Sequence, residues 1–264
     1  MRSRPWRWGA DFAHDAELNS PFYFSAIVAV SALLVPGDAS AMHLADGVLP
    51  AKWCAVWAVL ALPFIVVAFR RFERRRRDDA FSTPFTAMIG AAVFALSCMP
   101  IPVPVVGTCS HPCGTGLAGI LLGPSATVLL TVVALTIQAL FLAHGGLTTF
   151  GADVLSMGIA GGFIGHAAFR AARSVGWSLG PAAFLAGLLA DWATYATTAL
   201  ELALGLHGER SAYGVFGAVA LAFAPTQLPL GILEGFLTAG AIVFVHERRP
   251  DLLLRLRAAS TRAA

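Results

Sequence analysis

The stretch AKWCAVWAVLALPFIVVAFRRFERRRR, residues 51–77, joins a long run of apolar side chains to a cluster of arginines. About 20 mostly apolar residues suffice to cross a bilayer, and the run at 51–69 carries a single charge, Lys52. Arginines that directly follow such a run are typical of the cytoplasmic end of a membrane span. The stretch therefore predicts a transmembrane helix that ends in the cytoplasm.

The composition extends this prediction to the whole chain. Of the 264 residues, 57% are hydrophobic and 12% are charged, and the mean hydropathy is +0.73. Soluble domains contain roughly 25% charged residues. The composition excludes a soluble enzyme or a nucleic-acid binder, and the sequence predicts an all-α polytopic protein surrounded by lipid.

Further spans are predicted at 81–99, 125–143, 150–169, 177–205 and, after a break at Pro225, 228–245. The apolar stretch 116–123 is too short to cross alone and is predicted to turn at Gly123 and Pro124. It is either a stunted helix or a re-entrant segment.

Arginine clusters set the predicted orientation. The clusters follow the spans at 51–69 and 150–169 and fill the C-terminal tail, and the positive-inside rule places them in the cytoplasm. They comprise Arg70, Arg71, Arg74, Arg75, Arg76, Arg77, Arg170, Arg173, Arg248, Arg249, Arg255, Arg257 and Arg262. With residue 42 outside and the tail inside, the number of crossings is odd, which predicts roughly seven helices. The loops at 101–114, 144–149 and 206–213 then face outward.

Residues 1–41 resemble a signal peptide. Arg2, Arg4 and Arg7 precede a 14-residue apolar run at 22–35, and Ala39-Ser40-Ala41 fits an A-x-A cleavage pattern. The alternative is an uncleaved segment at the membrane edge. Cleavage gives three parts: a signal peptide at 1–41, a transmembrane metal-capture domain at 42–246 and a cytoplasmic basic tail at 247–264.

Cleavage after Ala41 would create a chelating terminus. The α-amine of Met42, the amide nitrogen of His43 and His43 Nδ1 together suit Ni(II), Cu(II) and related divalent ions. His111, in the outward loop IPVPVVGTCSHPCGTG (101–116), is the candidate for a fourth nitrogen ligand, although a solvated loop histidine is the alternative.

Cysteines and a further histidine lie near these candidates in the sequence. Cys109 and Cys113 flank His111 and are interpreted as a thiolate site for a softer metal, an outer-face disulfide or small buried residues. His144 begins an outward loop and is either a neighbour of the ion or an ordinary loop residue.

Three motifs resemble the CbiM/NikM family of substrate-specific membrane (S) subunits of energy-coupling factor (ECF) transporters. They are MHLADGVLP (42–50), GTCSHPCGTGLAGILLGP (107–124) and QALFLAHGGLTTFGAD (138–153). The resemblance implies an S-component-like bundle with an extra N-terminal helix and binding of Co(II) or Ni(II) by Met42, His43 and His111, with no permanent cofactor. Asp153 stands where the family usually has Asn, and Cys113 is not expected from the family.

The resemblance also implies partners and a location. These are a coupling (T) membrane subunit, a pair of ATP-binding-cassette ATPases and in some cases a small accessory membrane protein. The alanines Ala87, Ala91 and Ala95 repeat every four residues, which suits close helix packing, and relatives dock through such stripes. The expected location is the bacterial inner membrane, with the metal site on the outer face and the C-terminus in the cytoplasm.

Other functions remain as alternatives. His43, His111 and His144 around an open zinc position would make an intramembrane metalloenzyme, but no HExxH or GxSxG motif supplies its general base. A stand-alone secondary transporter would show repeated halves. Lys52 follows no glycine-rich turn, so a Walker site is excluded. The nitrogen ligands suit Ni(II) well, but the CSHP form of the loop resembles that of cobalt-associated relatives, which favours Co(II) over Ni(II). Neighbouring cobalamin biosynthesis genes would support cobalt.

Ionisable residues within the predicted spans are functional candidates by default, because a charge in the bilayer is costly. They are Asp153, His166, Asp191, Glu201 and Glu234.

Overall fold

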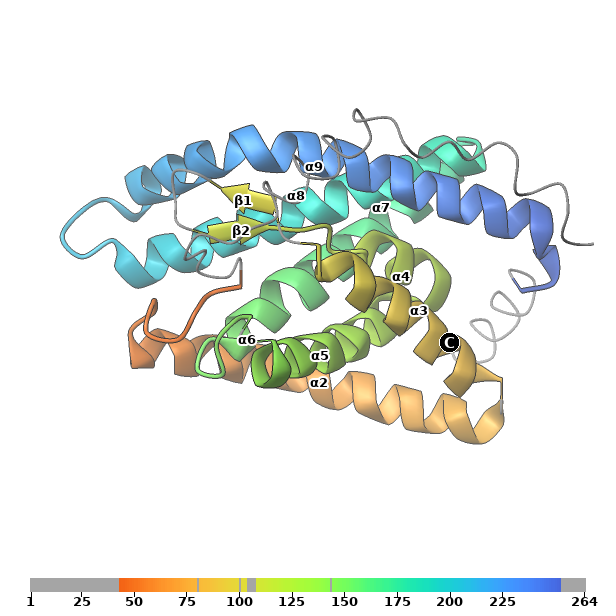
Figure 1. The fold of residues 1–264 in the computed structure, drawn as a ribbon, viewed down its shortest axis with the longest axis horizontal. Coiled ribbons are helices and arrows are strands. Elements are labelled where there is room, and N and C mark those ends of the chain that lie inside the picture. Colours follow the sequence, from red (N-terminus) through yellow and green to blue (C-terminus); the bar gives the residue numbers. More distant parts are fainter. Residues whose placement is uncertain (1–42, 80, 100, 104–107, 143, 253–264) are drawn as a thin grey trace, which may run out of the picture. The chain divides into compact units, whose positions relative to one another are not determined.

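The computed structural model describes residues 43–79, 81–99, 101–103, 108–142 and 144–252 (Figure 1). The chain divides into two units, 1–38 and 39–264, and all described residues belong to the second. The predicted signal peptide, Met42 and the tail beyond residue 252 lie outside the described residues.

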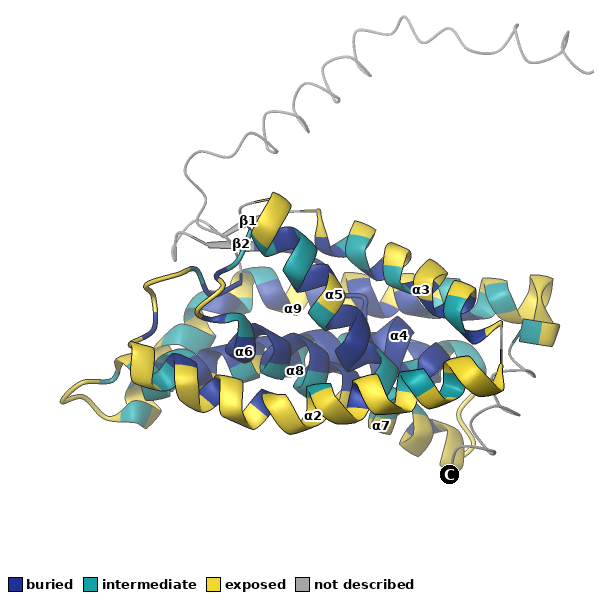
Figure 2. Ribbon diagram, turned by 90° about the horizontal axis from the view of Figure 1, so that it is seen from below, coloured by how far each residue is buried: buried dark blue, intermediate teal, exposed yellow. Residues whose placement is uncertain are grey.

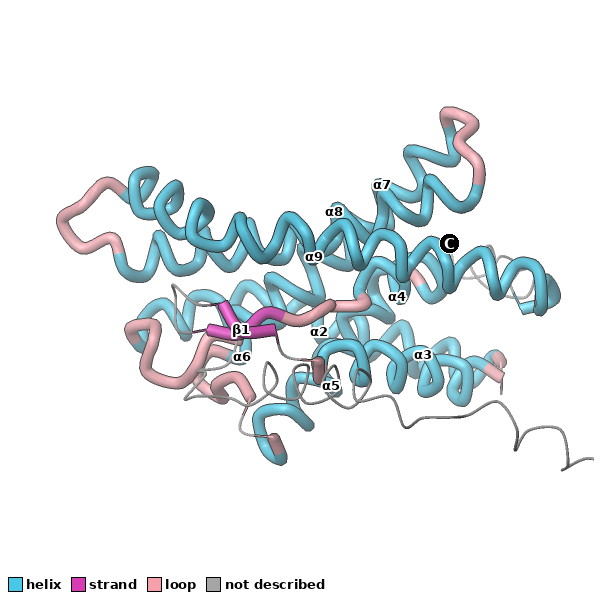
Figure 3. Tube along the Cα trace, turned by 45° about the horizontal axis from the view of Figure 1, so that its top comes forward, coloured by secondary structure: helices cyan, strands magenta, loops and turns pink. Residues whose placement is uncertain are grey.

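The described chain is almost entirely helical, as predicted, with two short strands in the loop between α3 and α4 that the sequence did not predict (Figure 3). The elements are α2 (Ala51–Asp78), α3 (Ser82–Ser97), β1 (Ile101–Val103), β2 (Thr108–Ser110), α4 (Thr115–Leu122), α5 (Pro124–Phe141), α6 (Phe150–Asp153), the π-helix η1 (Val154–Gly161), α7 (Gly162–Ser174), α8 (Leu179–Leu206) and α9 (Ala212–Arg248). The strands pair antiparallel, with Pro102 opposite Cys109.

The apolar helices identify a multi-pass membrane protein. Four described helical segments are long and apolar enough to cross a bilayer: Ala51–Asp78, Pro124–Phe141, Phe150–Ser174 and Ala212–Arg248. Only 22% of the residues in the most apolar stretch of α2 are buried inside the protein. The side chains of Val59, Leu62 and Phe69 are each more than half exposed. Figure 2 shows this exposed face along α2. A helix with such a surface is stable in lipid rather than in water.

Helix α4 is the short element that the sequence placed at 116–123. Its eight residues span about 12 Å, so it does not cross a bilayer alone. The chain turns at Gly123, whose φ of 84° suits glycine, and Pro124 begins α5 at the position where proline is favoured. The predicted turn is confirmed.

Small residues bring α4, α8 and α9 close together. A Cβ on Gly116 would lie 2.7 Å from Gly187 Cα of α8, and one on Gly187 would lie 2.7 Å from the Glu234 carbonyl oxygen of α9. The backbones therefore approach too closely for larger side chains. This packing fixes α8 between α4 and α9.

The predicted break at Pro225 is wrong. Helix α9 runs without interruption from Ala212 to Arg248 and contains both Pro225 and Pro229. Proline removes a backbone donor, but a helix in a membrane protein tolerates it where a neighbouring helix supports the segment. Here α9 packs lengthwise against α8 (Figure 1).

The arginine-rich helix ends gather at one end of the bundle. Figures 1 and 3 show the C-terminal ends of α2, α7 and α9 toward one end, and β1, β2 and the α8–α9 connection toward the other. The last turns of α2 and α9 carry Arg75, Arg76, Arg77 and Arg248. The loops predicted to face outward therefore lie away from the basic ends.

Candidate metal-binding site

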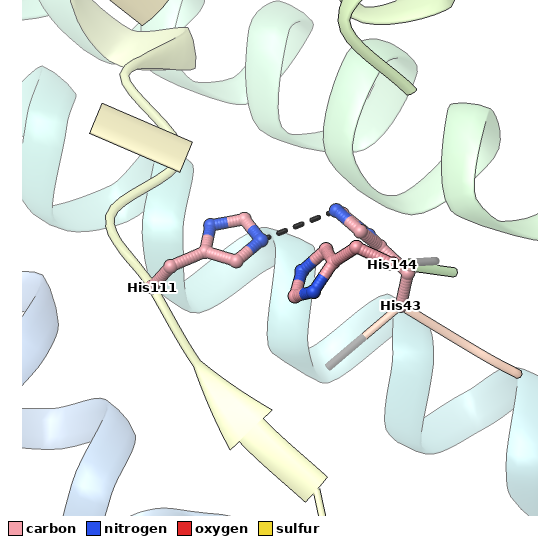
Figure 4. A group of neighbouring side chains, drawn as sticks. All are labelled: His43, His111 and His144. Atoms are coloured by element: carbon pink, nitrogen blue, oxygen red, sulfur yellow. Dashed lines mark hydrogen bonds between the residues drawn. The ribbon is translucent and has the colours of Figure 1, made fainter. Parts of the chain in front are cut away.

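Three histidines from distant parts of the chain meet in the loops at one end of the bundle (Figure 4). His43 lies in the segment before α2, His111 lies between β2 and α4, and His144 lies between α5 and α6. One ring nitrogen of each lies within 4.8 Å of those of the other two. His43 and His111 are buried, and His144 is half-buried.

The two innermost rings meet through their Nε2 atoms. His43 Nε2 lies 3.1 Å from His111 Nε2, the distance of a hydrogen bond between the rings. Nitrogens bound to one ion lie about 2.9–3.3 Å apart, so the two rings are close enough for each to offer one nitrogen to the same ion. His144 packs edge-on against His43, with ring centroids 5.0 Å apart. Its buried Nε2 has no hydrogen-bond partner among the described residues.

Burial keeps all three rings neutral. Burial and the neighbouring rings lower the pKa of His43 well below its ordinary value, and burial lowers the pKa of His111 to about 3. The pKa of His144 is lowered for the same reason. A neutral imidazole has a lone pair on one nitrogen, which is the form that binds a metal ion.

Hydrogen bonds indicate which ring nitrogen carries the proton in His111 and in His43. His111 Nδ1 lies 3.0 Å from the Pro112 carbonyl oxygen, so that nitrogen carries the proton and Nε2 has the lone pair. His43 Nε2 then faces two acceptors, His111 Nε2 and Gln138 Oε1, the latter at 3.1 Å. The proton of His43 is therefore on Nε2, and its lone pair is on Nδ1.

Gln138 on α5 orients the His43 ring. Its amide nitrogen donates to Ser97 Oγ at 2.9 Å and to the Ser97 carbonyl oxygen at 3.2 Å. These bonds to α3 leave its oxygen pointing at His43. The fully buried Gln138 thus connects the histidine cluster to two helices.

The segment that carries His43 is held by the start of α6. Asp153 Oδ1 accepts a hydrogen bond from the backbone nitrogen of Leu44 at 2.9 Å and lies 3.8 Å from His43 Nδ1. The Thr149 hydroxyl donates to the Leu44 carbonyl oxygen. Gly145 has a φ of 86°, and a Cβ there would lie 2.9 Å from His43 Cβ, so glycine allows the chain to pass the ring.

Side chains of α8 and α9 hold the His111 loop from the other side. The Tyr195 hydroxyl donates to the His111 carbonyl oxygen at 3.3 Å, and Ser110 donates to Gln227 at 3.0 Å. Glu234 accepts from the backbone nitrogens of Cys113 and Gly114, both at 2.8 Å.

The other predicted residues are distributed as follows. Met42 and the side chain of Cys109 lie outside the described part of the structure. Cys113 is a buried free thiol, and His166 bonds to the Gly119 carbonyl oxygen of α4 at 2.8 Å rather than joining the site. The predicted docking residues Ala87, Ala91 and Ala95 form an exposed stripe on α3.

The sequence analysis missed several residues that support the site. Gln138 lies within the third motif but was not selected, although a glutamine in an apolar helix is itself a signal. The contributions of Tyr195 and Gln227 carry no such signal, because their partners are 84 and 117 residues away.

The substitution Gln138→Leu is expected to weaken Co(II) binding about 10- to 100-fold, the usual loss when a group that orients a ligand is removed. Leucine is similar in size but cannot hold the His43 ring. Isothermal titration of the purified protein measures the change. Thr136→Val on the same helix is the control, because its hydroxyl bonds only to the Val132 carbonyl oxygen among the described partners. Equal affinity in Gln138→Leu and the control would show that Gln138 does not orient the ring.

Comparisons with known proteins identify the family of this chain. Residues 43–252 match the CbiM family model, described as a cobalt uptake substrate-specific transmembrane region. A cobalt transport protein CbiM from Sorangium cellulosum is 66% identical over 82% of this chain and 96% of its own length. One from Geobacter sulfurreducens is 54% identical over 89% of this chain and 68% of its own length.

A solved structure has a similar fold. The crystal structure of a truncated transition metal transporter superposes with a TM-score of 0.69 and 26% sequence identity, covering 78% of this chain and 99% of that one. With its family model matched over 43–252 and close relatives over most of its length, the chain belongs to the CbiM family.

Proposed function

We propose that the chain is the substrate-binding subunit of an ATP-driven ECF-type importer, and that it captures Co(II) in preference to Ni(II). The observation that carries this proposal is the convergence of three neutral, largely buried imidazoles from separate loops. The named cobalt transport proteins among its relatives support a transporter rather than an enzyme.

The proposed ligands are the amine of Met42, the amide nitrogen and Nδ1 of His43, and the ring of His111. The lone pair assigned to His43 Nδ1 supports this chelate. Because His43 Nε2 faces His111 in the structure, loading through Nδ1 requires the His43 ring to turn about its Cβ–Cγ bond. His144 and Asp153 then lie beside the ion's ligands, and Asp153 holds the backbone at Leu44. The free terminus requires cleavage after Ala41.

The proposed orientation follows from the two ends of the bundle. The arginine-rich ends of α2, α7 and α9 belong in the cytoplasm, together with the tail at 247–264. The histidine loops then open to the outer face of the bacterial inner membrane. We count seven passes of the chain in this arrangement; the pass at α4, which is too short to cross alone, includes the buried segment 110–114 before it.

The energy for uptake is assigned to partner subunits. With Lys52 at the start of α2 as the only lysine, the chain has no Walker site. We assign ATP hydrolysis to a pair of ABC ATPases that act through a coupling subunit, with or without a small accessory membrane protein. The exposed alanine stripe of α3 suits close approach of a helix from the coupling subunit.

The test is cobalt uptake by cells that lack their own importers. We expect accumulation only when the chain is expressed with its coupling and ATPase subunits, and none when the ATPases carry a substitution of their catalytic glutamate. Purified alone, the chain should still load Co(II). Accumulation without active ATPases would instead indicate a stand-alone secondary transporter. Excess Ni(II) as competitor measures the preference between the two ions.

A further inference from the structure

A second cluster of metal-binding side chains lies apart from the three histidines. It comprises Cys113 from the loop before α4, Asp191 from α8 and Glu234 from α9. One ligand atom of each lies within 4.8 Å of those of the other two. Their exposed fractions are 0%, 0% and 1%, so the cluster is closed within the bundle.

Asp191 is the unusual member. Both of its carboxyl oxygens are buried, and their only hydrogen bond among the described residues is one shared with the Glu234 carboxyl group. Two buried carboxyl groups in contact hold one proton between them, because two like charges at that distance are costly. A divalent ion in place of that proton would meet a thiol and two carboxyl groups as ligands.

Glu234 is held in place by the backbone. Its two oxygens accept hydrogen bonds from the amide nitrogens of Cys113 and Gly114, each at 2.8 Å. Each carboxylate oxygen has two lone pairs, so one remains on each oxygen for a further partner. The same bonds fix the Cys113 backbone beside the two carboxyl groups.

We propose that Cys113, Asp191 and Glu234 form a second divalent-metal site, distinct from the histidine cluster. One thiolate and two carboxyl groups suit a borderline ion such as Co(II) or Zn(II). When two of the three groups are ionised, their charges balance that of the ion. Ligands at about 2.0–2.3 Å from one ion lie about 3.3–3.7 Å apart, which fits ligand atoms that all lie within 4.8 Å of one another.

A comparison within the chain shows why this cluster, and not every buried carboxyl group, carries the proposal. Glu201 is buried as well, and neither of its carboxyl oxygens has a hydrogen-bond partner among the described residues. It belongs to no group of three metal-binding side chains among the described residues. Glu201→Gln is therefore a matched control.

The experiment titrates Co(II) into the purified processed protein, which begins at Met42, under anaerobic conditions with a thiol-free reductant. The choice of ion rests on the proposed function. We expect two equivalents to bind and a thiolate-to-Co(II) charge-transfer band to accompany one of them. The band should persist in His43→Ala, which loses the other equivalent. Cys113→Ser should lose the band and one equivalent, and Asp191→Asn should bind that equivalent at least about 10-fold more weakly.

Control variants and a second measurement make the outcome decisive. Cys54→Ser, Cys98→Ser, Cys109→Ser and Glu201→Gln should all keep the band. If Cys113→Ser does not fold, X-ray absorption at the cobalt edge of His43→Ala should still detect a sulfur ligand. Two outcomes would overturn the second site and leave the proposed function intact. One is saturation with a single equivalent of Co(II) and no thiolate band; the other is loss of the band in Cys109→Ser alone. Conversely, if the thiolate band appears and His43→Ala binds as many equivalents of Co(II) as the wild type, the histidine site is contradicted and the second site is not.

Discussion

The substitution His111→Ala is expected to lower Co(II) affinity by more than about 100-fold. Loss of a group that merely orients a metal ligand costs about 10- to 100-fold, and His111 is proposed as a ligand itself. Its Nε2 carries a lone pair and lies 3.1 Å from His43. Equilibrium titration with Co(II), followed by elemental analysis of the desalted protein, measures the loss.

The control for this experiment is His166, which bonds to α4, the helix that follows the His111 loop. His166→Ala removes a ring that bonds to the Gly119 carbonyl oxygen and should leave loading unchanged. His144→Ala adds information on the ligand set, because we expect a loss of about 10-fold from a neighbour of the ligands. A loss as large as that of His111→Ala would mean that three imidazoles hold the ion. Unchanged affinity in His111→Ala would contradict the site.

Helix positions were largely predictable from the sequence, because apolar runs in a membrane protein correspond closely to helices. The runs at 125–143 and 177–205 overlap α5 and α8 along nearly their full lengths. The continuity of α9 through Pro225 was not predictable in this way. It depends on packing against α8, which a local pattern does not contain.

The π-helix η1 is a second feature that the pattern missed. Residues 154–161 belong to the predicted span at 150–169, but their backbone bonds are those of a π-helix. Single turns of this kind often occur near functional sites, and η1 directly follows Asp153. The apolar periodicity of such a segment does not distinguish it from an α-helix.

Only those residues of the candidate site that lie in short, recognisable sequence motifs were predictable. Met42, His43 and His111 stand out because a processed terminus and a polar loop are local features. His144 was as readily interpreted as an ordinary loop residue, and only the fold brings its ring to 5.0 Å from that of His43. The bonds of Glu234 to Cys113 and Gly114 cross 121 and 120 residues, which no local signal reports.

Placing one glycine before Met42 of the mature chain is expected to reduce Co(II) affinity by more than about 100-fold. The added residue converts the proposed α-amine ligand into an amide and moves the charged terminus away from His43. Since the loss removes a ligand rather than a group that orients one, it should exceed the 10- to 100-fold range of supporting residues. Mass spectrometry of the processed wild-type protein should first show that it begins at Met42.

The matched control keeps the amine and changes the side chain. A mature chain with Met42→Leu should load Co(II) as the wild type does, because the chelate uses the terminal nitrogen and not the thioether. Weak binding in Met42→Leu alone would instead point to the methionine side chain as the ligand. Full affinity in the glycine-extended chain would leave His43, His111 and His144 as the ligand set, since these three rings meet without any contribution from the terminus.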